Sequence, residues 1–425
     1  MEYNEYLKNR KPYQEDGVLL LLERKHACLF YKPGKGKTYP TVEAARAVDK
    51  AMGGNAKVLV LSTADAIKNM WLAEIEPQHI MPSNTVYLSF NSAIQDLTKA
   101  KLLKLKWDIL IVDESHKIKS HNSKTSKLVY MLSRKCEYVW GLTGTPRGNT
   151  DVDIFCQFHN MCISEWGTIT YSHFIDQCCD LDQKFFHGQM VKIPIGINRR
   201  YKPGWERNVA MYTQRVDYDV DDGMPDLNIE LVEIDYTPTK EYNQAEDGVV
   251  SIGEYESTMT KLAAVTKLHQ IVNGFAYIYD DDGNRITHEI ERCKKLDWLK
   301  ENVTNEPTVI VYRFEADKEN ICKLFDNRWT ESVDDFKNGS FNILLLQCSR
   351  CESFNLQMCK HMIFYTLDYS YIKYNQMLHR IWRMGQTDNV LVNVLIHKDT
   401  VETKIWNTVR NKEKFADLFM SIKGV

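Results

Sequence analysis

The sequence lacks the long apolar run that a membrane-spanning protein needs. No stretch reaches the roughly 18 consecutive apolar residues of a transmembrane helix, and the opening MEYNEYLKNRKPYQ has no apolar core of a signal peptide. The eleven cysteines show no spacing typical of a disulfide framework, and several lie in apolar, strand-like runs. These absences predict a soluble protein of a reducing, intracellular compartment.

The chain also lacks an excess of positive charge. Its 54 basic and 57 acidic residues give a net charge of −3, so contacts with nucleic acid would have to come from local basic patches. With 425 residues it is too long for one ordinary core, and two or three domains are expected. The hydrophobic fraction of 44% and the charged fraction of 26% are typical of globular proteins.

Strand-like apolar runs alternate with helical stretches along the chain. The runs cover residues 27–31, 57–61, 107–112 and 138–142 in the first half and 308–312, 342–347, 362–367 and 391–396 in the second. Continuous apolar runs of this length are typical of strands buried on both faces of a parallel sheet. The alternation predicts an α/β fold with doubly wound parallel sheets, whose ligands bind at the carboxyl ends of the strands.

The segment YKPGKGKT, which follows the first apolar run, has the parts of a phosphate-binding loop. Gly34 and Gly36 let backbone N–H groups close round phosphate oxygens, Lys37 can reach the β and γ phosphates, and the Thr38 hydroxyl can hold Mg²⁺. Tyr31 stands where the usual motif has its first glycine, and by itself such a loop could be an ordinary surface turn. We expect it to bind ATP with Mg²⁺.

Two carboxylates directly follow the run 107–112. Asp113 is expected to hold Mg²⁺, and Glu114 to orient and deprotonate the attacking water. An acidic loop after a strand is the simpler alternative, but the phosphate loop upstream favours the catalytic role. Near the N-terminus, Gln14 can pair with the edge of an adenine through its amide, although it could instead be a polar residue at a helix start.

A third group of polar residues lies in the second half of the chain. Gln376, Arg380 and Arg383 are spaced by four and three residues, so on a continuous helix they share one face. An arginine from a second lobe can neutralise the charge that develops on the γ-phosphate, and Gln376 is expected to contact the nucleotide. The alternative is a helix with solvated arginines.

In this order the motifs resemble those of superfamily-two helicases. They are Gln14, GKGKT (34–38), DESH (113–116), LTGTP (142–146) and HRIWRMGQ (379–386). The DESH and GLTGTPRGN forms resemble the Swi/Snf branch, whose last motif usually reads GRxxRxGQ. The resemblance covers nearly the whole chain and is weakest over residues 149–222. In its compactness the chain resembles the helicases of bacterial viruses.

The resemblance implies two RecA-like lobes with the ATP site at their interface. A turn signal at Gly223 places the first lobe at residues 1–222, with an insertion at 149–222, and the second at 223–425, with a helical segment at 239–275. Thr143, Gly144 and Thr145 would link the nucleotide state to lobe movement. The implied activity is a DNA-dependent ATPase that translocates on double-stranded or branched DNA in replication, repair or recombination.

The same resemblance implies where the protein works and what it contacts. Lys117, Lys119 and Lys124 lie in a lysine-rich segment similar to the one that follows the acidic box in the family, and are expected to contact DNA phosphates. Arg199 and Arg200 belong to a second basic cluster, 198–207, whose Tyr201 and Trp205 could stack on bases. Targeting would come from a protein partner, the insertion or DNA structure, in the cytoplasm of a bacterial or virus-infected cell or in a eukaryotic nucleus.

One departure and two alternatives qualify this interpretation. Family members usually have glycines before the Asn-Leu of the fifth motif, whereas this chain has Cys351 and Ser353, so a stiffer loop is expected there. An RNA helicase or annealing enzyme with the same motor is one alternative function. A nucleic-acid-binding scaffold with a decayed ATPase is the other, although Lys37, Glu114 and Arg380 are intact.

Overall fold

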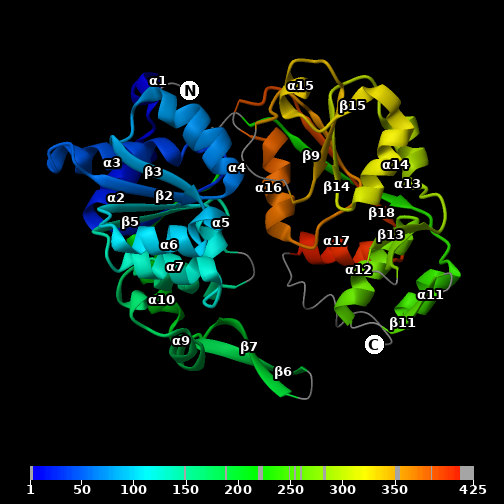
Figure 1. Cartoon of the computed structure of the whole chain (residues 1–425), viewed down its shortest axis with the longest axis horizontal. Helices are drawn as coiled ribbons and strands as arrows, with labels where there is room; N and C mark the ends of the chain where they lie inside the picture. The colour runs from blue at the N-terminus through cyan, green and yellow to red at the C-terminus, as the bar shows by residue number, and fades with distance from the viewer. Residues whose placement is uncertain are drawn as a thin grey trace. The chain divides into compact units, whose positions relative to one another are not determined.

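The computed structural model describes residues 3–147, 150–186, 189–218, 224–247, 249–252, 255–258, 261–280, 284–349, 355–383 and 385–411. The chain forms two compact units, Met1–Asp222 and Gly223–Val425, and each is described by itself (Figure 1). Among the described helices, none has the length and apolar character needed to cross a bilayer. The expected loop with Cys351 and Ser353 lies outside the described residues.

A six-stranded parallel sheet forms the centre of the first unit, in the order β3–β2–β4–β5–β1–β8. Its strands are β1 (His26–Tyr31), β2 (Lys57–Ser62), β3 (Asn84–Ser89), β4 (Ile109–Asp113), β5 (Tyr138–Leu142) and β8 (Thr213–Val216). Alternate side chains of β1 enter two different cores: Cys28 and Phe30 pack on one face, Leu29 and Tyr31 on the other. Burial on both faces explains why the strand sequence is apolar without alternation.

Helices cover both faces of this sheet. One face carries α2 (Pro12–Arg24), α3 (Thr38–Ala51) and the π-helix η1 (Ile67–Ile75). The other carries α6 (Asp96–Lys104), α7 (Lys124–Ser133), α8 (Val152–Asn160), α9 (Tyr171–Cys178) and α10 (Lys202–Tyr212). Shorter elements are α1 (Tyr3–Asn9), α4 (Ala64–Ala66), η2 (Glu76–Gln78), α5 (Phe90–Ala93), η3 (Ser115–Ile118) and η4 (Glu165–Gly167).

The region expected as an insertion contributes to the core and the sheet of the first unit. It supplies α8, α9, α10 and β8, which pairs in parallel with β1. Its aromatic side chains pack together, and the rings of Phe155 and Phe174 stack with centroids 3.6 Å apart. The antiparallel hairpin β6 (Cys179–Phe186) and β7 (Gln189–Ile197) follows α9 and extends away from the helices of its own unit (Figure 1).

The second unit contains another six-stranded parallel sheet, in the order β15–β16–β14–β17–β18–β9. Its strands are β9 (Leu227–Ile234), β14 (Thr308–Tyr312), β15 (Trp329–Thr330), β16 (Ile343–Gln347), β17 (His361–Phe364) and β18 (Val390–His397). Alternate side chains of β14 again enter separate cores, with Val309 and Val311 in one and Ile310 and Tyr312 in the other. The two parallel sheets, each with helices on both faces, confirm the predicted α/β class.

Helices also cover both faces of the second sheet. One face carries α11 (Lys240–Glu246), α12 (Lys261–Val272), α15 (Val333–Lys337), α16 (Tyr371–Ile381) and α17 (Val401–Arg410). The other carries α13 (Lys295–Asn302) and α14 (Glu315–Phe325), which is followed by η6 (Asp326–Arg328). The hairpin strands β12 (Phe275–Tyr279) and β13 (Arg285–Glu289) pair in antiparallel register.

The expected helical segment at 239–275 is not continuous. The hairpin strands β10 (Val249–Ile252) and β11 (Tyr255–Thr258) lie between α11 and α12. The adjacent β-branched residues Val249 and Val250 favour a strand over a helix. The prediction of one helical segment was therefore wrong in its middle part.

Candidate functional site

In the first unit, the predicted phosphate loop joins β1 to the first turn of α3. Gly34 and Gly36 have φ values of 87° and 70°, in the left-handed region that glycine tolerates best. The helix begins at Thr38, directly after Lys37. Because the first backbone N–H groups of a helix have no intrahelical partner, this loop-to-helix junction favours anions such as phosphate.

Gln14 contacts this loop from α2. Its amide Nε2 donates to the carbonyl oxygens of Lys35 and Gly36, each at 3.4 Å, and its Oε1 accepts the Lys11 N–H at 3.0 Å. A Cβ atom at Gly36 would lie 2.7 Å from the same Nε2, so the residue at 36 has no room for a side chain. Gln14 thus packs against the phosphate loop and also serves as the polar residue at a helix start.

Asp113 ends β4 and is buried, with 2% of its surface exposed. Its Oδ2 accepts hydrogen bonds from Ser62 Oγ at 3.0 Å and from Trp71 Nε1 at 3.1 Å, and its Oδ1 accepts the Glu114 N–H at 3.0 Å. Burial raises the pKa of the Asp113 carboxyl above its usual value, and the positive charge of Lys37 opposes the rise. A divalent cation nearby would favour the ionised carboxylate further.

Glu114 has a φ of 53°, a left-handed backbone conformation that residues with a side chain rarely adopt. For a residue with a Cβ atom this conformation costs about 1 kcal/mol or more, and such residues gather at functional sites. The carboxylate lies 3.8 Å from Lys37 Nζ and 3.2 Å from His116 Nδ1. The fold therefore brings Lys37, Asp113 and Glu114 together from two different strand ends.

The segment Thr143–Thr145 lies between the acidic box and the phosphate loop. Thr143 Oγ1 is 3.0 Å from His116 Nδ1 and accepts the Thr145 N–H at 3.1 Å. A Cβ atom at Gly144 would lie 2.9 Å from Pro33 Cδ and 3.1 Å from the Tyr31 carbonyl oxygen. The predicted coupling residues thus contact both halves of the site, with His116 as a link that sequence reasoning did not assign.

The groups predicted to hold Mg²⁺ are one carboxylate, that of Asp113, and one hydroxyl, that of Thr38. Across the described ranges no group of three or more His, Cys, Asp or Glu side chains could hold a metal ion by itself. This donor set suits Mg²⁺, which is usually bound through one or two protein oxygens together with waters and substrate phosphates. Thr38 Oγ1 itself donates to the sulfur of Met70 at 3.5 Å.

In the second unit, the predicted arginine face is only partly present. Gln376 and Arg380 lie on α16, one turn apart, but the helix ends at Ile381 and Arg383 follows it. The expectation that all three side chains share one helical face was therefore wrong. Trp382 leaves the helical region with ψ at 93°, and Gln386 Nε2 donates to the carbonyl oxygens of Ile381 at 3.2 Å and Cys359 at 2.9 Å.

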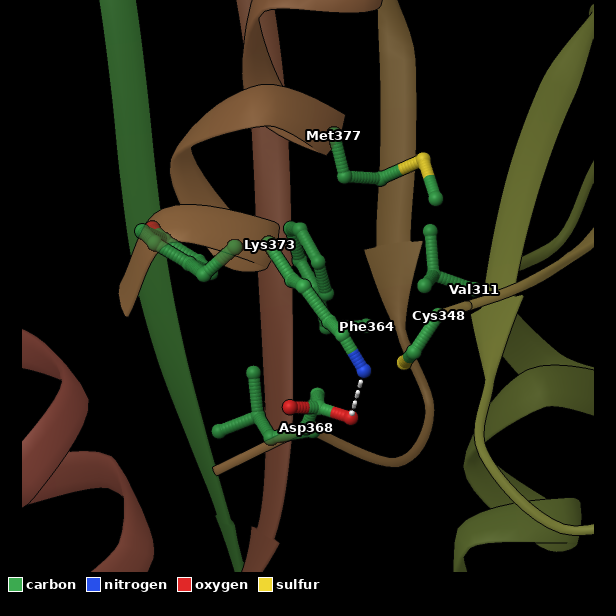
Figure 2. Close-up of a pocket in the computed structure, with 8 residues that line it drawn as sticks. Val311, Cys348, Phe364, Asp368, Lys373 and Met377 are labelled. Atoms are coloured by element: carbon green, nitrogen blue, oxygen red, sulfur yellow. Dashed lines mark hydrogen bonds and ion pairs between the residues drawn. The ribbon is translucent and has the colours of Figure 1, made fainter. Parts of the chain in front are cut away.

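An ionic cluster that the sequence did not predict lies near the carboxyl ends of β14 and β17. Asp368 accepts from Arg313 at 2.5 Å and from Lys373 at 2.9 Å, and the Arg313 guanidinium lies 4.0 Å from the ring centre of Tyr369. Figure 2 shows the Lys373–Asp368 ion pair beside Phe364 in a small pocket with mainly apolar walls. Because Lys373, the basic residue that lines the pocket, already pairs with Asp368, the pocket offers little to a phosphate.

The predicted nucleic-acid residues lie on the surface of the first unit. Lys117 and Lys124 are exposed and Lys119 is half-buried, while Arg199 and Arg200 are exposed just before α10. Trp205 of the same cluster has 3% of its surface exposed and packs in the core. The suggestion that Trp205 stacks on bases was wrong, because its ring fills space between α8, α9 and α10.

Comparison with known families shows which proteins the chain is similar to. Residues 83–180 match the SNF2-related domain, and residues 284–385 match the helicase conserved C-terminal domain. The chain is related to the Swi/Snf-type helicases. The matches include the acidic box, Thr143–Thr145 and all three predicted residues of the second unit, whereas Gln14 and the phosphate loop lie before the first match. The resemblance read from the motifs, the two RecA-like lobes and the class of helicase-type ATP hydrolase are confirmed.

Relatives are distant but extend over much of the chain. An uncharacterized ATP-dependent helicase, YqhH of Bacillus subtilis, is 22% identical over 94% of this chain and 78% of its own length. The SWI/SNF-related matrix-associated actin-dependent regulator of chromatin subfamily A-like protein 1 of Drosophila melanogaster is 23% identical over 95% of this chain and 55% of its own length. The chain thus spans about half of the Drosophila protein.

Two further similarities are to a DNA annealing helicase and to a solved structure. The DNA annealing helicase and endonuclease ZRANB3 of Mus musculus is 23% identical over 41% of this chain and 18% of its own length. Among solved structures, the Sulfolobus solfataricus SWI2/SNF2 ATPase core in complex with dsDNA is 20% identical, covers 97% of this chain and 92% of that one, and has a TM-score of 0.42. A likeness at that score carries no argument about function.

Proposed function

We propose that this Swi/Snf-related protein hydrolyses ATP with Mg²⁺ and uses the energy to translocate along double-stranded or branched DNA. The observation that supports the proposal most directly is the convergence of Lys37, Asp113 and Glu114, with Glu114 3.8 Å from Lys37. These groups lie at the carboxyl ends of β1 and β4, which are separated by β5 in one parallel sheet, and α/β proteins bind their ligands at that edge.

Each residue of the first unit has a distinct part in the proposed reaction. Lys37 and the backbone N–H groups of Gly34, Gly36 and Thr38 bind the phosphates, and Gln14 contacts the adenine after releasing the loop carbonyls. The Thr38 hydroxyl and the Asp113 carboxylate would hold Mg²⁺, which supplies positive charge to the phosphate oxygens. Glu114 accepts a proton from the attacking water.

In the proposed reaction, the second unit would supply further positive charge to the nucleotide. We assign residues 1–222 as the first motor lobe and 223–425 as the second, with ATP between them. Gln376, Arg380 and Arg383 then contact the nucleotide, and the arginines neutralise charge on the γ-phosphate. Thr143 links this state to lobe movement through its contact with His116, which also touches Glu114.

We propose DNA as the nucleic acid along which the protein moves, because the first unit has exposed basic side chains and the names of several relatives refer to chromatin or DNA. Lys117, Lys119, Lys124, Arg199 and Arg200 would contact backbone phosphates, which positions a protein on nucleic acid without reading sequence. Targeting to a site of replication, repair or recombination would come from a protein partner or from DNA structure. The protein would act in a bacterial or virus-infected cytoplasm or in a nucleus.

Steady-state ATP hydrolysis tests the substrate directly. The rate is measured without nucleic acid and then with single-stranded DNA, double-stranded DNA, branched DNA and RNA at one fixed salt concentration, because phosphate contacts weaken as salt rises. Stimulation by duplex or branched DNA is expected. Stimulation by RNA alone would favour an RNA helicase, and no hydrolysis under any condition would favour a scaffold with a decayed ATPase.

Lys37→Ala tests the phosphate site. We expect this change to abolish ATP hydrolysis while the thermal melting curve stays close to that of the wild type, because Lys37 lies at the site surface and not in a core. The matched control is Lys32→Ala in the same loop, which removes an equal charge that lies 3.8 Å from Asp217. Wild-type turnover by Lys37→Ala would contradict the assignment.

Glu114→Gln separates binding from chemistry. The amide keeps the size of the side chain but cannot accept a proton, so hydrolysis should fall by at least about a hundredfold. Binding of a fluorescent ADP should remain near the wild-type level, since the phosphate loop is unchanged. Hydrolysis at the wild-type rate would remove Glu114 from the role of general base.

A further inference from the structure

The π-helix η1 contacts both groups that are predicted to hold the metal. Two adjacent residues make the contacts: Met70 places its sulfur 3.5 Å from Thr38 Oγ1, and Trp71 places its indole Nε1 3.1 Å from Asp113 Oδ2. A π-helix is rare, and short π-helical segments often occur at functional sites. Here the wider helical turn carries Met70 and Trp71 toward the ends of two different elements, α3 and β4.

Trp71 is fully buried in the apolar core that covers one face of the first sheet. An indole ring can only donate a hydrogen bond, and a buried N–H group is costly unless it finds an acceptor. The acceptor here is a carboxylate instead of a backbone carbonyl. This choice makes the hydrogen bond stronger, because the acceptor is charged.

Asp113 receives three donors in a fixed arrangement. Ser62 Oγ and Trp71 Nε1 both donate to Oδ2, and the Glu114 N–H donates to Oδ1. Three donors fix the rotation of the carboxylate, so its remaining lone pairs keep one direction. Hydrogen bonds from Trp71 and Ser62 also lower the pKa of this carboxyl, against the larger effect of burial.

We propose that Trp71 and Ser62 are positioning residues, which hold the Asp113 carboxylate in the orientation that the metal-bound nucleotide requires. The inference rests on the proposed function and deepens it, because it identifies the groups behind the metal-binding carboxylate. Outer-shell partners of metal ligands commonly affect metal affinity as well as folding, since they orient the ligand. Met70 of the same helix accepts a hydrogen bond from the Thr38 hydroxyl, whose oxygen lone pairs would stay available to a metal.

The test measures binding of a fluorescent ADP with Mg²⁺ and with EDTA. Trp71→Phe keeps an aromatic ring in the core and removes the N–H group. We expect the gain in ADP affinity on adding Mg²⁺ to be about tenfold smaller for this variant than for the wild type, because the metal contact depends on Asp113. The ADP affinity in EDTA should stay within about twofold of the wild-type value.

Trp140→Phe is the matched control. Trp140 is equally buried in the same core, but its indole N–H donates to the Leu21 carbonyl oxygen at 3.1 Å. This variant should keep the full effect of Mg²⁺, so any loss specific to Trp71→Phe is not a general consequence of core substitution. Ser62→Ala removes the second donor to the same oxygen with little change in volume, and it carries the test if Trp71→Phe does not fold.

The outcomes separate this inference from the proposed function. If the wild type shows no Mg²⁺-dependent ADP binding and no hydrolysis, the proposed function fails. If the wild type shows both and the Trp71→Phe and Ser62→Ala variants keep the wild-type gain from Mg²⁺, the positioning role alone is overturned. A reduced gain from Mg²⁺ in these variants, with Trp140→Phe unaffected, supports the role.

Discussion

Asp317 in the first turn of α14 has two carboxyl oxygens with different surroundings. Its Oδ2 accepts from the Phe314 N–H at 3.0 Å and from Thr366 Oγ1 at 2.8 Å, whereas its Oδ1 has no hydrogen-bond partner among the described residues. The residue is buried, and burial raises the pKa of its carboxyl to about 6. A protonated carboxyl or an amide would therefore suit this position better than a carboxylate.

Asp317→Asn should stabilise the protein relative to the wild type by an amount that grows as pH rises from about 4 to about 6 and then stays constant. An aspartate with a raised pKa in the folded state contributes stability below its unfolded pKa and loses it as pH rises through the folded value. The variant has no such titration, so its free energy of unfolding should exceed that of the wild type by up to about 3 kcal/mol at neutral pH. Denaturant unfolding at a series of pH values from about 4 to 8 measures the difference.

The exposed Asp334→Asn serves as its control, because it makes the same substitution at a side chain that is not buried. Its free energy of unfolding should stay within about 0.5 kcal/mol of the wild type. A pH-independent difference for Asp317→Asn would contradict the raised pKa.

At the scale of elements, one buried charge network joins four parts of the second unit. Lys295 of α13 pairs with Glu402 of α17 at 2.5 Å, and Glu402 also lies 3.3 Å from His269 Nε2 of α12 and 3.0 Å from His397 Nδ1 of β18. Burial opposes ionisation, but Lys295 and the two histidines together hold the pKa of Glu402 well below its usual range. Burial also lowers the pKa of His269 to about 4, so this ring is neutral at physiological pH.

Lys295→Met should destabilise the protein by about 3–5 kcal/mol, because it leaves the Glu402 charge buried without its main partner. The matched control is Lys318→Met, which removes a partly exposed lysine that pairs with Glu315 at 2.9 Å. That change should cost less than about 1 kcal/mol, as is usual for surface ion pairs. Thermal or denaturant unfolding measures both.

The double variant Lys295→Met with Glu402→Leu removes both charges and should recover much of the loss. Equal stabilities for Lys295→Met and Lys318→Met would show that the buried pair has no special role.

The sequence predicted the elements well where local patterns decide them. The apolar run at 308–312 became β14, and the run at 391–396 lies within β18. The convergence of Lys37, Asp113 and Glu114 could be predicted because the loop after β1 and the end of β4 lie at the same edge of a parallel sheet. The hydrogen bonds from Ser62 and Trp71 to Asp113 could not be predicted, because these two residues precede Asp113 by 51 and 42 positions in the chain.

The missed features have physical reasons of the same kind. The β10–β11 hairpin lies within a stretch whose ends are good helix formers, and the strand pairing prevails only between them. At the end of α16, the Gln386 side chain donates to the carbonyl of Ile381 and also to that of Cys359, which lies 27 residues earlier in the chain. A prediction from helical spacing alone extends the helix past Ile381 to Arg383, because the spacing contains no information on tertiary contacts.

At the scale of the whole molecule, the two units differ in the chemistry that each offers. The first unit holds a lysine, two carboxylates and a predicted phosphate loop, which we propose bind the nucleotide and activate water. Arg380 and Arg383 belong to the second unit, and rapid ATP hydrolysis would need their positive charge in the transition state. This division predicts that the second unit affects the rate of the chemical step more than it affects nucleotide binding.

Arg380→Ala tests that prediction in the full chain. We expect single-turnover hydrolysis to slow by about a thousandfold, because an arginine finger acts mainly on charge that develops in the transition state. Binding of a fluorescent ADP should change little, since the phosphate loop and Gln14 are intact. Arg380→Lys should not restore the rate, because an ammonium group lacks the planar fork of a guanidinium.

Arg292→Ala is the control for Arg380→Ala, since it removes an exposed arginine of the same unit that pairs with Asp297 at 2.8 Å. Its single-turnover rate should match that of the wild type. If Arg380→Ala hydrolysed ATP as fast as this control, the second unit would have no part in the chemistry. If Arg380→Ala instead lost ADP binding, Arg380 would act on the ground state, and the proposed division between binding and catalysis would be wrong.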